Sequence, residues 1–370
     1  MAIEDLTVRA GVLREPAEIV FADELTRLGR EDALPKPSGW RLSPRAVRTF
    51  IIGDEARGVR RKFYGDDPLI DRCIVTLMSN RALLLVGQPG TAKSMLSELF
   101  AAAISGLSTQ TIQGTAGTTE DQIRYSWNYA LLLAQGPTRQ ALVPAPLYDA
   151  MANGTLVRFE EITRVQPEVQ DSLISVLSDK VVHVPELSGD DGSLFARPGF
   201  NLVATANLRD RGVHEMSSAL KRRFNFETVR PIGDRALEKR LVQEQTQALL
   251  DAAGIAVTVE ADVTDLLVTA FVDLRNGTTD DGTVIERPTA VMSTAEAVAV
   301  GFAAALDAHY FGDGTVDGRY IARHLVGTVL KDNPDDAKRL RHWFDVAVKP
   351  RAQSDALWQS AFSARGEFDW

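Results

Sequence analysis

A glycine-containing turn between an apolar run and a helical segment constrains this chain most. The apolar run covers residues 82–86, and a helix is expected to begin at the end of the turn. The turn and the start of this helix read Gly87, Gln88, Pro89, Gly90, Thr91, Ala92, Lys93 and Ser94. Such a turn aims successive backbone N–H groups inward at a helix N-terminus, which makes an anion site. The segment predicts a phosphate-binding loop, in which Lys93 reaches the β- and γ-phosphates and the Ser94 hydroxyl coordinates Mg²⁺.

One position departs from the usual pattern of such a loop. Ala92 stands where a second glycine is normal. Alanine has the smallest side chain after glycine, so we expect the backbone still to approach a phosphate closely. A glycine-rich turn that binds nothing is the alternative, and the flanking strand and helix disfavour it.

The chain divides into three regions. Residues 1–62 form an N-terminal helical extension with a Pro/Gly-rich break at 35–39. From 63 to 231, short apolar runs alternate with amphipathic stretches, which is typical of a parallel sheet flanked by helices. Strands are expected at 82–86, 108–113, 156–159 and 201–205. Residues 232–370 are rich in Ala, Leu and Val and are expected to be helical, so the predicted fold is an α/β domain followed by an all-helical region.

Two carboxylates follow the third of these strands. Glu160 is placed to organise Mg²⁺, either directly or through water, and Glu161 to polarise an attacking water. The first residue of such a pair is usually Asp, and the extra methylene of Glu160 could shift the metal geometry. An exposed acidic helix cap is the alternative interpretation.

Two further polar features follow along the chain. Asn207 closely follows the strand at 201–205 and could orient water beside the acidic pair, although asparagine is also common in turns. Arg222 and Arg223 end a short helical stretch before Phe224. They could complement the helix dipole, or they could reach the γ-phosphate of a neighbouring subunit as an arginine finger.

The order of these four features resembles that of the AAA+ ATPases, most closely the MoxR group and, within it, the YehL-like branch. The segments that carry the resemblance are 87–94, 159–164, 204–207 and 220–224, with further similarity at 113–129. The resemblance covers 63–231 well, the helical region more loosely and the first sixty residues least. It implies an AAA+ P-loop NTPase core, an α/β fold of a parallel sheet flanked by helices, followed by an all-helical lid domain.

The resemblance also implies roles for individual residues. Lys93 and Ser94 match Walker A, and Glu160 and Glu161 occupy Walker B. Asn207 matches sensor 1.

Two arginine roles follow from the same resemblance. Arg223 matches the arginine finger, with Arg222 as the second choice. In the family the lid helix begins with a Ser-Pro-Arg sensor 2, whereas here Arg287 precedes the proline, so Arg287 is a displaced sensor-2 candidate.

Assembly and partners are implied in the same way. Proteins of this group usually form hexameric rings, bind ATP and Mg²⁺, and act as chaperone-like remodelers beside a partner with a von Willebrand factor A domain. The family also has an insertion in its second helix and a β-hairpin before sensor 1, and residues 127–143 and 181–198 are the counterparts here. Tyr125, Trp127 and Tyr129 are either a packed strand or a substrate-gripping insert.

Composition narrows the function further. The chain carries 41 Lys+Arg against 50 Asp+Glu, a formal net charge of −9, which disfavours a general nucleic-acid binder. Its one cysteine, Cys73, excludes an intrachain disulfide, and the five histidines lack metal-site spacing. No apolar run approaches the roughly 20 residues of a membrane span, and the start of the chain lacks the pattern of a secretory signal. We therefore expect a cytoplasmic protein.

Three functions are consistent with the sequence to different degrees. The first is an ATP-driven ring that remodels a protein partner. The second is an ATP-gated scaffold with little turnover. Glu160 in place of the usual aspartate and the displaced Arg287 favour this interpretation. The third, a nucleic-acid motor, is disfavoured by the acidic balance, and a GTPase is disfavoured because no Asn-Lys-x-Asp motif occurs.

Overall fold

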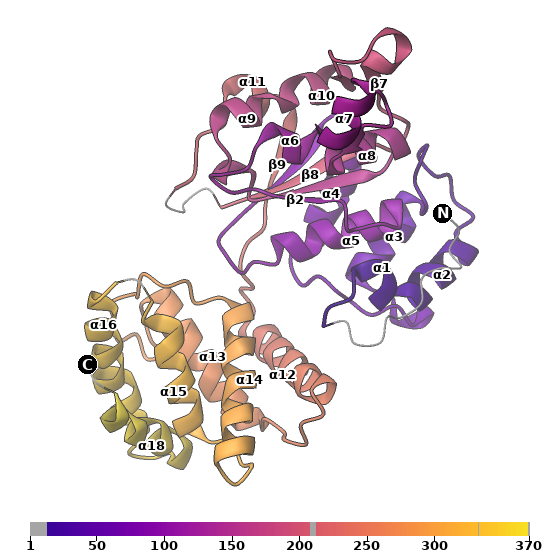
Figure 1. Cartoon of the computed structure of the whole chain (residues 1–370). Coiled ribbons are helices and arrows are strands. Elements are labelled where there is room, and N and C mark those ends of the chain that lie inside the picture. Colours follow the sequence, from indigo (N-terminus) through magenta and orange to yellow (C-terminus); the bar gives the residue numbers. More distant parts are fainter. Residues whose placement is uncertain (1–12, 208–211, 332, 369–370) are drawn as a thin grey trace. The chain divides into compact units, whose positions relative to one another are not determined.

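A computed structural model describes residues 13–207, 212–331 and 333–368 (Figure 1). The chain divides into two compact units. The first takes in residues 1–88 and 92–230, and the second takes in 231–370 together with the loop tip Pro89–Thr91.

A parallel sheet forms the centre of the first unit. Within the described residues it has five strands in the order β2-β5-β8-β1-β9. Their bounds are β1 Ala82–Val86, β2 Thr111–Gln113, β5 Leu156–Glu160, β8 Asn201–Ala206 and β9 Phe224–Thr228. The strands β1, β5 and β8 are buried along their whole length, as in sheets covered on both faces. The predicted α/β fold is confirmed, and β9, which pairs with β1 at the edge, was not among the expected strands.

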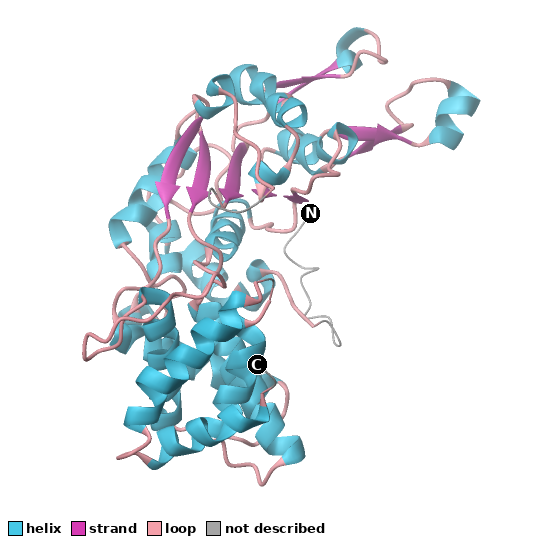
Figure 2. Cartoon of the chain, turned by 90° about the vertical axis from the view of Figure 1, so that its left-hand side faces the viewer, coloured by secondary structure: helices cyan, strands magenta, loops and turns pink. Residues whose placement is uncertain are grey.

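Helices cover both faces of this sheet (Figure 2). Side chains alternate along β1: Leu83 and Leu85 join a core with α1–α5, whereas Leu84 and Val86 join a core on the other face. On the first face lie α1 Ala17–Val20, α2 Ala22–Glu31, α3 Pro44–Ile52, α4 Asp67–Met78 and α5 Lys93–Ser105, and the 3₁₀ turn Glu55–Arg57 follows α3 in the chain. On the other face are α8 Pro146–Asn153, the 3₁₀ turn Ile162–Arg164, α9 Pro167–Asp171, α10 Leu173–Asp179 and α11 Ser218–Lys221. The described residues before 63 therefore share a hydrophobic core with the sheet. The domain boundary expected at residue 62 stays a prediction.

Two hairpins extend away from the body of the sheet (Figure 2). One pairs β3 Tyr125–Trp127 with β4 Leu142–Pro144, is preceded by α6 Glu120–Ile123 and encloses α7 Tyr129–Gln135. The other pairs β6 Val181–His183 with β7 Ser193–Phe195 and encloses the 3₁₀ turn Gly189–Gly192. The rings of Tyr125 and Trp127 pack edge to face with centroids 6.1 Å apart, whereas Tyr129 is 73% exposed. The aromatic segment is therefore packed at its start and exposed at its end.

Helices build the second unit. They are α12 Arg235–Ala252, α13 Ala261–Asn276, α14 Thr294–Phe311, α15 Gly318–Val329, α16 Asp335–Trp343, the π-helical turn Phe344–Val348, α17 Lys349–Arg351, α18 Ala356–Ser363 and the 3₁₀ turn Ala364–Glu367. Helix α14 begins at Thr294 because Ser293 and Glu296 form a capping box there. None of the helices in the described part of the chain is long and apolar enough to cross a membrane.

Candidate functional site

The phosphate loop joins β1 to α5 through two residues with left-handed backbone. Gly90 has φ 74°, and Ala92, which is the N-cap of α5, has φ 64°. For an L-residue this conformation costs roughly 1–2 kcal/mol. The usual glycine at position 92 is thus explained by backbone conformation, whereas the sequence argument considered only the size of the side chain.

Lys93 points its ammonium group back into the loop. The residue is 6% exposed, and its Nζ donates hydrogen bonds to Gly87 O at 3.1 Å and to Gln88 O at 2.8 Å. These carbonyl oxygens hold the positive charge beside the loop backbone, where a phosphate would bind.

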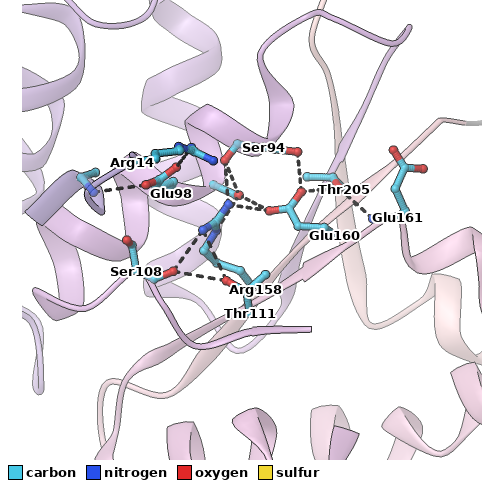
Figure 3. Close-up of polar contacts among 11 residues, drawn as sticks. Arg14, Ser94, Glu98, Ser108, Thr111, Arg158, Glu160, Glu161 and Thr205 are labelled. Atoms are coloured by element: carbon cyan, nitrogen blue, oxygen red, sulfur yellow. Dashed lines mark hydrogen bonds and ion pairs between the residues drawn. The ribbon is translucent and has the colours of Figure 1, made fainter. Parts of the chain in front are cut away.

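Glu160 is the most heavily bonded acid of the site (Figure 3). Among the described residues, four side chains donate hydrogen bonds to its carboxylate. Oε2 accepts from Ser94 Oγ at 2.6 Å and from Thr205 Oγ1 at 2.7 Å. Oε1 accepts from Ser97 Oγ at 2.6 Å and from Arg158 Nη2 at 2.9 Å. The sequence assigned both Ser94 and Glu160 to Mg²⁺, and the structure brings these two side chains into direct contact.

This set of donors keeps Glu160 charged although it is only 5% exposed. Burial by itself would raise the pKa of the carboxyl group, because it penalises the charged form. The hydroxyls of Ser94, Ser97 and Thr205 and the charge of Arg158 act in the opposite direction. Their sum is larger, so the pKa of Glu160 lies below its ordinary value.

Sequence reasoning missed Arg158, which lies two residues before Glu160 on β5. Residues two apart on a strand face the same side, so both side chains reach toward α5. The residue is 9% exposed, and a charged residue inside an apolar strand run was the signal that could have identified it.

Thr205 connects the two acids of the pair. Its hydroxyl accepts a hydrogen bond of 3.0 Å from the Glu161 amide and donates one to Glu160. Glu161 itself has a left-handed backbone, with φ 54°. Its Oε1 accepts from Asn207 Nδ2 at 2.7 Å, and its Oε2 lies 3.6 Å from Arg164 Nε. The expected neighbourhood of Glu160, Glu161 and Asn207 is therefore present at the carboxyl ends of β5 and β8.

The structure places Arg223 away from these acids. Arg223 O accepts from the amide of Ala82, the first residue of β1, so Arg223 lies at the amino edge of the sheet. Its side chain donates to Ser178 Oγ at 2.9 Å and to Ala219 O at 2.8 Å. Five strand residues at about 3.3 Å each separate this edge from the carboxyl edge. Arg223 and the exposed Arg222 therefore do not complete the site of their own chain.

Arg287 belongs to the second unit. Its Nε donates a hydrogen bond of 2.9 Å to Asn276 O, at the end of α13. The sensor-2 role of Arg287 stays a prediction.

The oxygen-rich chemistry of the site fits Mg²⁺. Within the described ranges, no group of three or more His, Cys, Asp or Glu side chains could hold a metal ion by itself. Magnesium is usually bound through one or two carboxylates together with substrate phosphates and waters, so a full protein cage is not required. Ser94 supplies a hydroxyl at the start of α5, and Glu160 supplies a carboxylate against it.

Comparison with known proteins identifies the class of this chain. The family described as "AAA domain (dynein-related subfamily)" matches residues 82–224, and that described as "YehL-like AAA+ ATPase C-terminal domain" matches 236–369. The fold and the phosphate-loop site are those of an AAA+ ATPase. The uncharacterized protein YehL of Escherichia coli K12 is 51% identical over 353 residues, which cover 95% of this chain and 96% of that protein. The chain belongs to the YehL-like AAA+ ATPases, as its sequence motifs predicted.

More distant similarities cover less of the chain or are weaker. The chaperone MoxR1 of Mycobacterium tuberculosis H37Rv is 31% identical over 170 residues, which cover 45% of this chain and 41% of that protein. The crystal structure of NtrX from Brucella abortus in complex with ADP aligns with a TM-score of 0.49 and 12% identity, covering 84% of this chain and 65% of that one. The MoxR1 match supports the relation to the MoxR-like group, and the NtrX alignment is too weak to add to it.

Proposed function

We propose that this chain hydrolyses ATP with Mg²⁺ and uses the cycle to remodel a protein partner. The observation that carries the proposal is the meeting of Ser94, Glu160, Glu161 and Asn207 at the carboxyl edge of the sheet, beside the phosphate loop. Ligands of open parallel sheets bind at this edge.

Each side chain has a distinct role in the proposed reaction. The loop amides and Lys93 would hold the phosphates, and Ser94 and Glu160 would hold a magnesium ion, which would supply positive charge against the phosphates. Glu161 accepts a proton from the attacking water. The amide of Asn207 fixes the Glu161 carboxylate through the bond to Oε1.

We also propose that copies of this chain assemble into a ring. Arg223 lies at the opposite edge of the sheet from Glu161, so a finger role requires the site of a neighbouring subunit. The relative MoxR1 is named a chaperone, and we propose a chaperone-like role for this chain as well. From the resemblance to the MoxR group we also propose a hexamer and a partner with a von Willebrand factor A domain.

Two variants test the enzymatic part. Lys93→Ala should weaken ATP binding tenfold or more, since a charge-assisted contact contributes roughly 1.5–3 kcal/mol. Glu161→Gln should bind ATP normally and hydrolyse it about 10²–10⁴-fold more slowly. Binding is measured with a fluorescent nucleotide and turnover by phosphate release. Unchanged ATP binding in Lys93→Ala would refute the phosphate-loop assignment, and normal turnover in Glu161→Gln would refute its role as the base.

A switch with little turnover is the second candidate. The observation that favours it is the engagement of Arg223 within its own chain, where its side chain donates hydrogen bonds to Ser178 Oγ and Ala219 O. A wild-type turnover no faster than that of Glu161→Gln, together with tight ATP binding, would favour the switch over the remodeler.

A further inference from the structure

Glu160 has one methylene more than the aspartate that usually begins a Walker B pair, and the structure shows what the longer side chain contacts. Its carboxylate extends toward α5 and contacts two hydroxyls of that helix, Ser94 and Ser97. These serines are three residues apart and therefore lie on the same helix face. An aspartate would end about 1.5 Å earlier, the length of one carbon–carbon bond.

We propose that Ser97 and Arg158 are positioning residues for Glu160 and set the affinity of the site for magnesium. The proposal rests on the proposed function, because it concerns a metal that only a nucleotide-binding site would recruit. It concerns two side chains that the Walker motifs do not include.

Arg158 fixes the direction of the Ser97 hydroxyl. Its Nε donates a hydrogen bond of 3.0 Å to Ser97 Oγ and so occupies a lone pair of that oxygen. The single Ser97 proton has two acceptors in reach, Ser94 O at 2.8 Å and Glu160 Oε1 at 2.6 Å. The carboxylate is the nearer and the charged acceptor, and charge-assisted bonds are the stronger ones. Ser97 therefore donates to Glu160.

Arg158 also ties Glu160 to the surrounding elements (Figure 3). Its Nη2 donates to Glu160 Oε1 and, at 3.0 Å, to Ser94 O in the first turn of α5. Its Nη1 donates to Ser108 O at 3.0 Å and to Thr111 Oγ1 at 3.3 Å. A buried guanidinium needs such partners, since an unpaired charge would be strongly destabilising. The rigid Arg158 thus holds Oε1, which leaves Oε2 directed at Ser94.

The contact with Glu160 determines where the hydroxyl proton of Ser94 points. Because Ser94 donates to Glu160 Oε2, its oxygen lone pairs are left for a metal. If Glu160 loses the donors on Oε1, its carboxylate can rotate and the Ser94 hydroxyl loses its fixed orientation. Partners that orient a metal ligand typically contribute about 10–100-fold to metal affinity.

The test uses the full-length chain and a magnesium titration of ATP binding. Ser97→Ala and Arg158→Met should raise the half-saturating Mg²⁺ concentration by about 10–100-fold. Arg158→Lys keeps the charge but loses the planar fork, so it should recover part of the affinity. ATP binding in EDTA should stay at the wild-type level in all three variants, because the loop and Lys93 are intact.

Ser105→Ala is the matched control. Ser105 lies on the same helix, is 7% exposed and accepts a bond from the Leu156 amide of the same strand, but it does not contact Glu160. It should change thermal stability without changing the magnesium titration. In a Glu160→Asp background, Ser97→Ala should have little further effect, since the shorter acid no longer reaches Ser97.

The outcomes separate this inference from the proposed function. If wild type binds ATP in a magnesium-dependent way and Ser97→Ala and Arg158→Lys leave the half-saturating concentration unchanged, the inference is wrong and the function stands. An effect as large in Ser105→Ala would also overturn it, since it would mean general loosening of α5. If wild type binds no ATP at all, the proposed function itself fails. Should Arg158→Met not fold, Ser97→Ala and Arg158→Lys still decide the question.

Discussion

The side-chain amide of Asn207 donates a 2.7 Å hydrogen bond to Oε1 of Glu161. The two residues directly follow the neighbouring strands β5 and β8, and the Thr205 hydroxyl fixes the Glu161 backbone beside them. The orientation of the proposed base is therefore set by β8.

This contact predicts the effect of Asn207→Ala. Without the amide the Glu161 carboxylate can rotate, so kcat should fall about 10- to 100-fold, less than the roughly 10²–10⁴-fold expected for loss of the base. ATP binding should change little. Steady-state turnover and nucleotide binding check this, with Asn201→Ala as control, because Asn201 begins the same strand and bonds to the carbonyls of Leu77 and Arg81. Loss of ATP binding in Asn207→Ala, or an equal drop in kcat in Asn201→Ala, would contradict the assignment.

The left-handed backbone at Ala92 predicts that Ala92→Gly stabilises the chain. Glycine adopts this conformation without the penalty of a Cβ atom, although it gains entropy in the unfolded state. The net gain should be roughly 0.5–1 kcal/mol in the free energy of unfolding, measured with urea. Ala101→Gly, in the interior of the same helix, should have the opposite sign. Destabilisation by Ala92→Gly would contradict the strain argument.

The pKa of Glu160 predicts a pH dependence of stability. Because its pKa in the folded chain is below its ordinary value of about 4.5, the stabilisation is fully present above that value and is lost as the pH falls through the folded pKa. The stability difference between wild type and Glu160→Gln should therefore shrink as the pH falls below about 4.5. Urea midpoints at each pH measure this difference. A difference that grows on acidification would mean that burial, which raises the pKa, outweighs the four donors.

The sequence predicted the parts of the site that follow from motif spacing. A strand, a glycine turn and a Lys-Ser pair determine the loop locally, and carboxyl ends of parallel strands meet at the same edge, so Glu160, Glu161 and Asn207 could be placed in advance. The bonds of Ser97 and Arg158 to Glu160 could not, because they depend on how α5 packs on β5. The edge strand β9 was missed although residues 224–227 alternate apolar and polar side chains, which is typical of a half-buried strand, because the segment was interpreted only as the end of the preceding helix.

The position of Arg223 predicts that the active form is an assembly. Since Arg223 lies at the amino edge of its own sheet, a direct contact of its side chain with a γ-phosphate requires another subunit's phosphate loop. Turnover per chain should rise with protein concentration as rings form. Arg223→Ala should bind ATP nearly normally and lose about 10³-fold or more in rate, the contribution of a finger supplied by a neighbour.

Mixing two inactive variants tests this arrangement directly. Arg223→Ala has an intact loop, and Lys93→Ala has an intact Arg223. In mixed rings, some interfaces pair the intact loop of one chain with the intact arginine of the next, so activity should partly return. Arg222→Ala serves as the control. It removes the neighbouring positive charge at the same helix end but keeps Arg223, so it tests whether the effect on hydrolysis is specific to Arg223. Turnover that is independent of concentration, with no recovery on mixing, would mean that the site is complete within one chain.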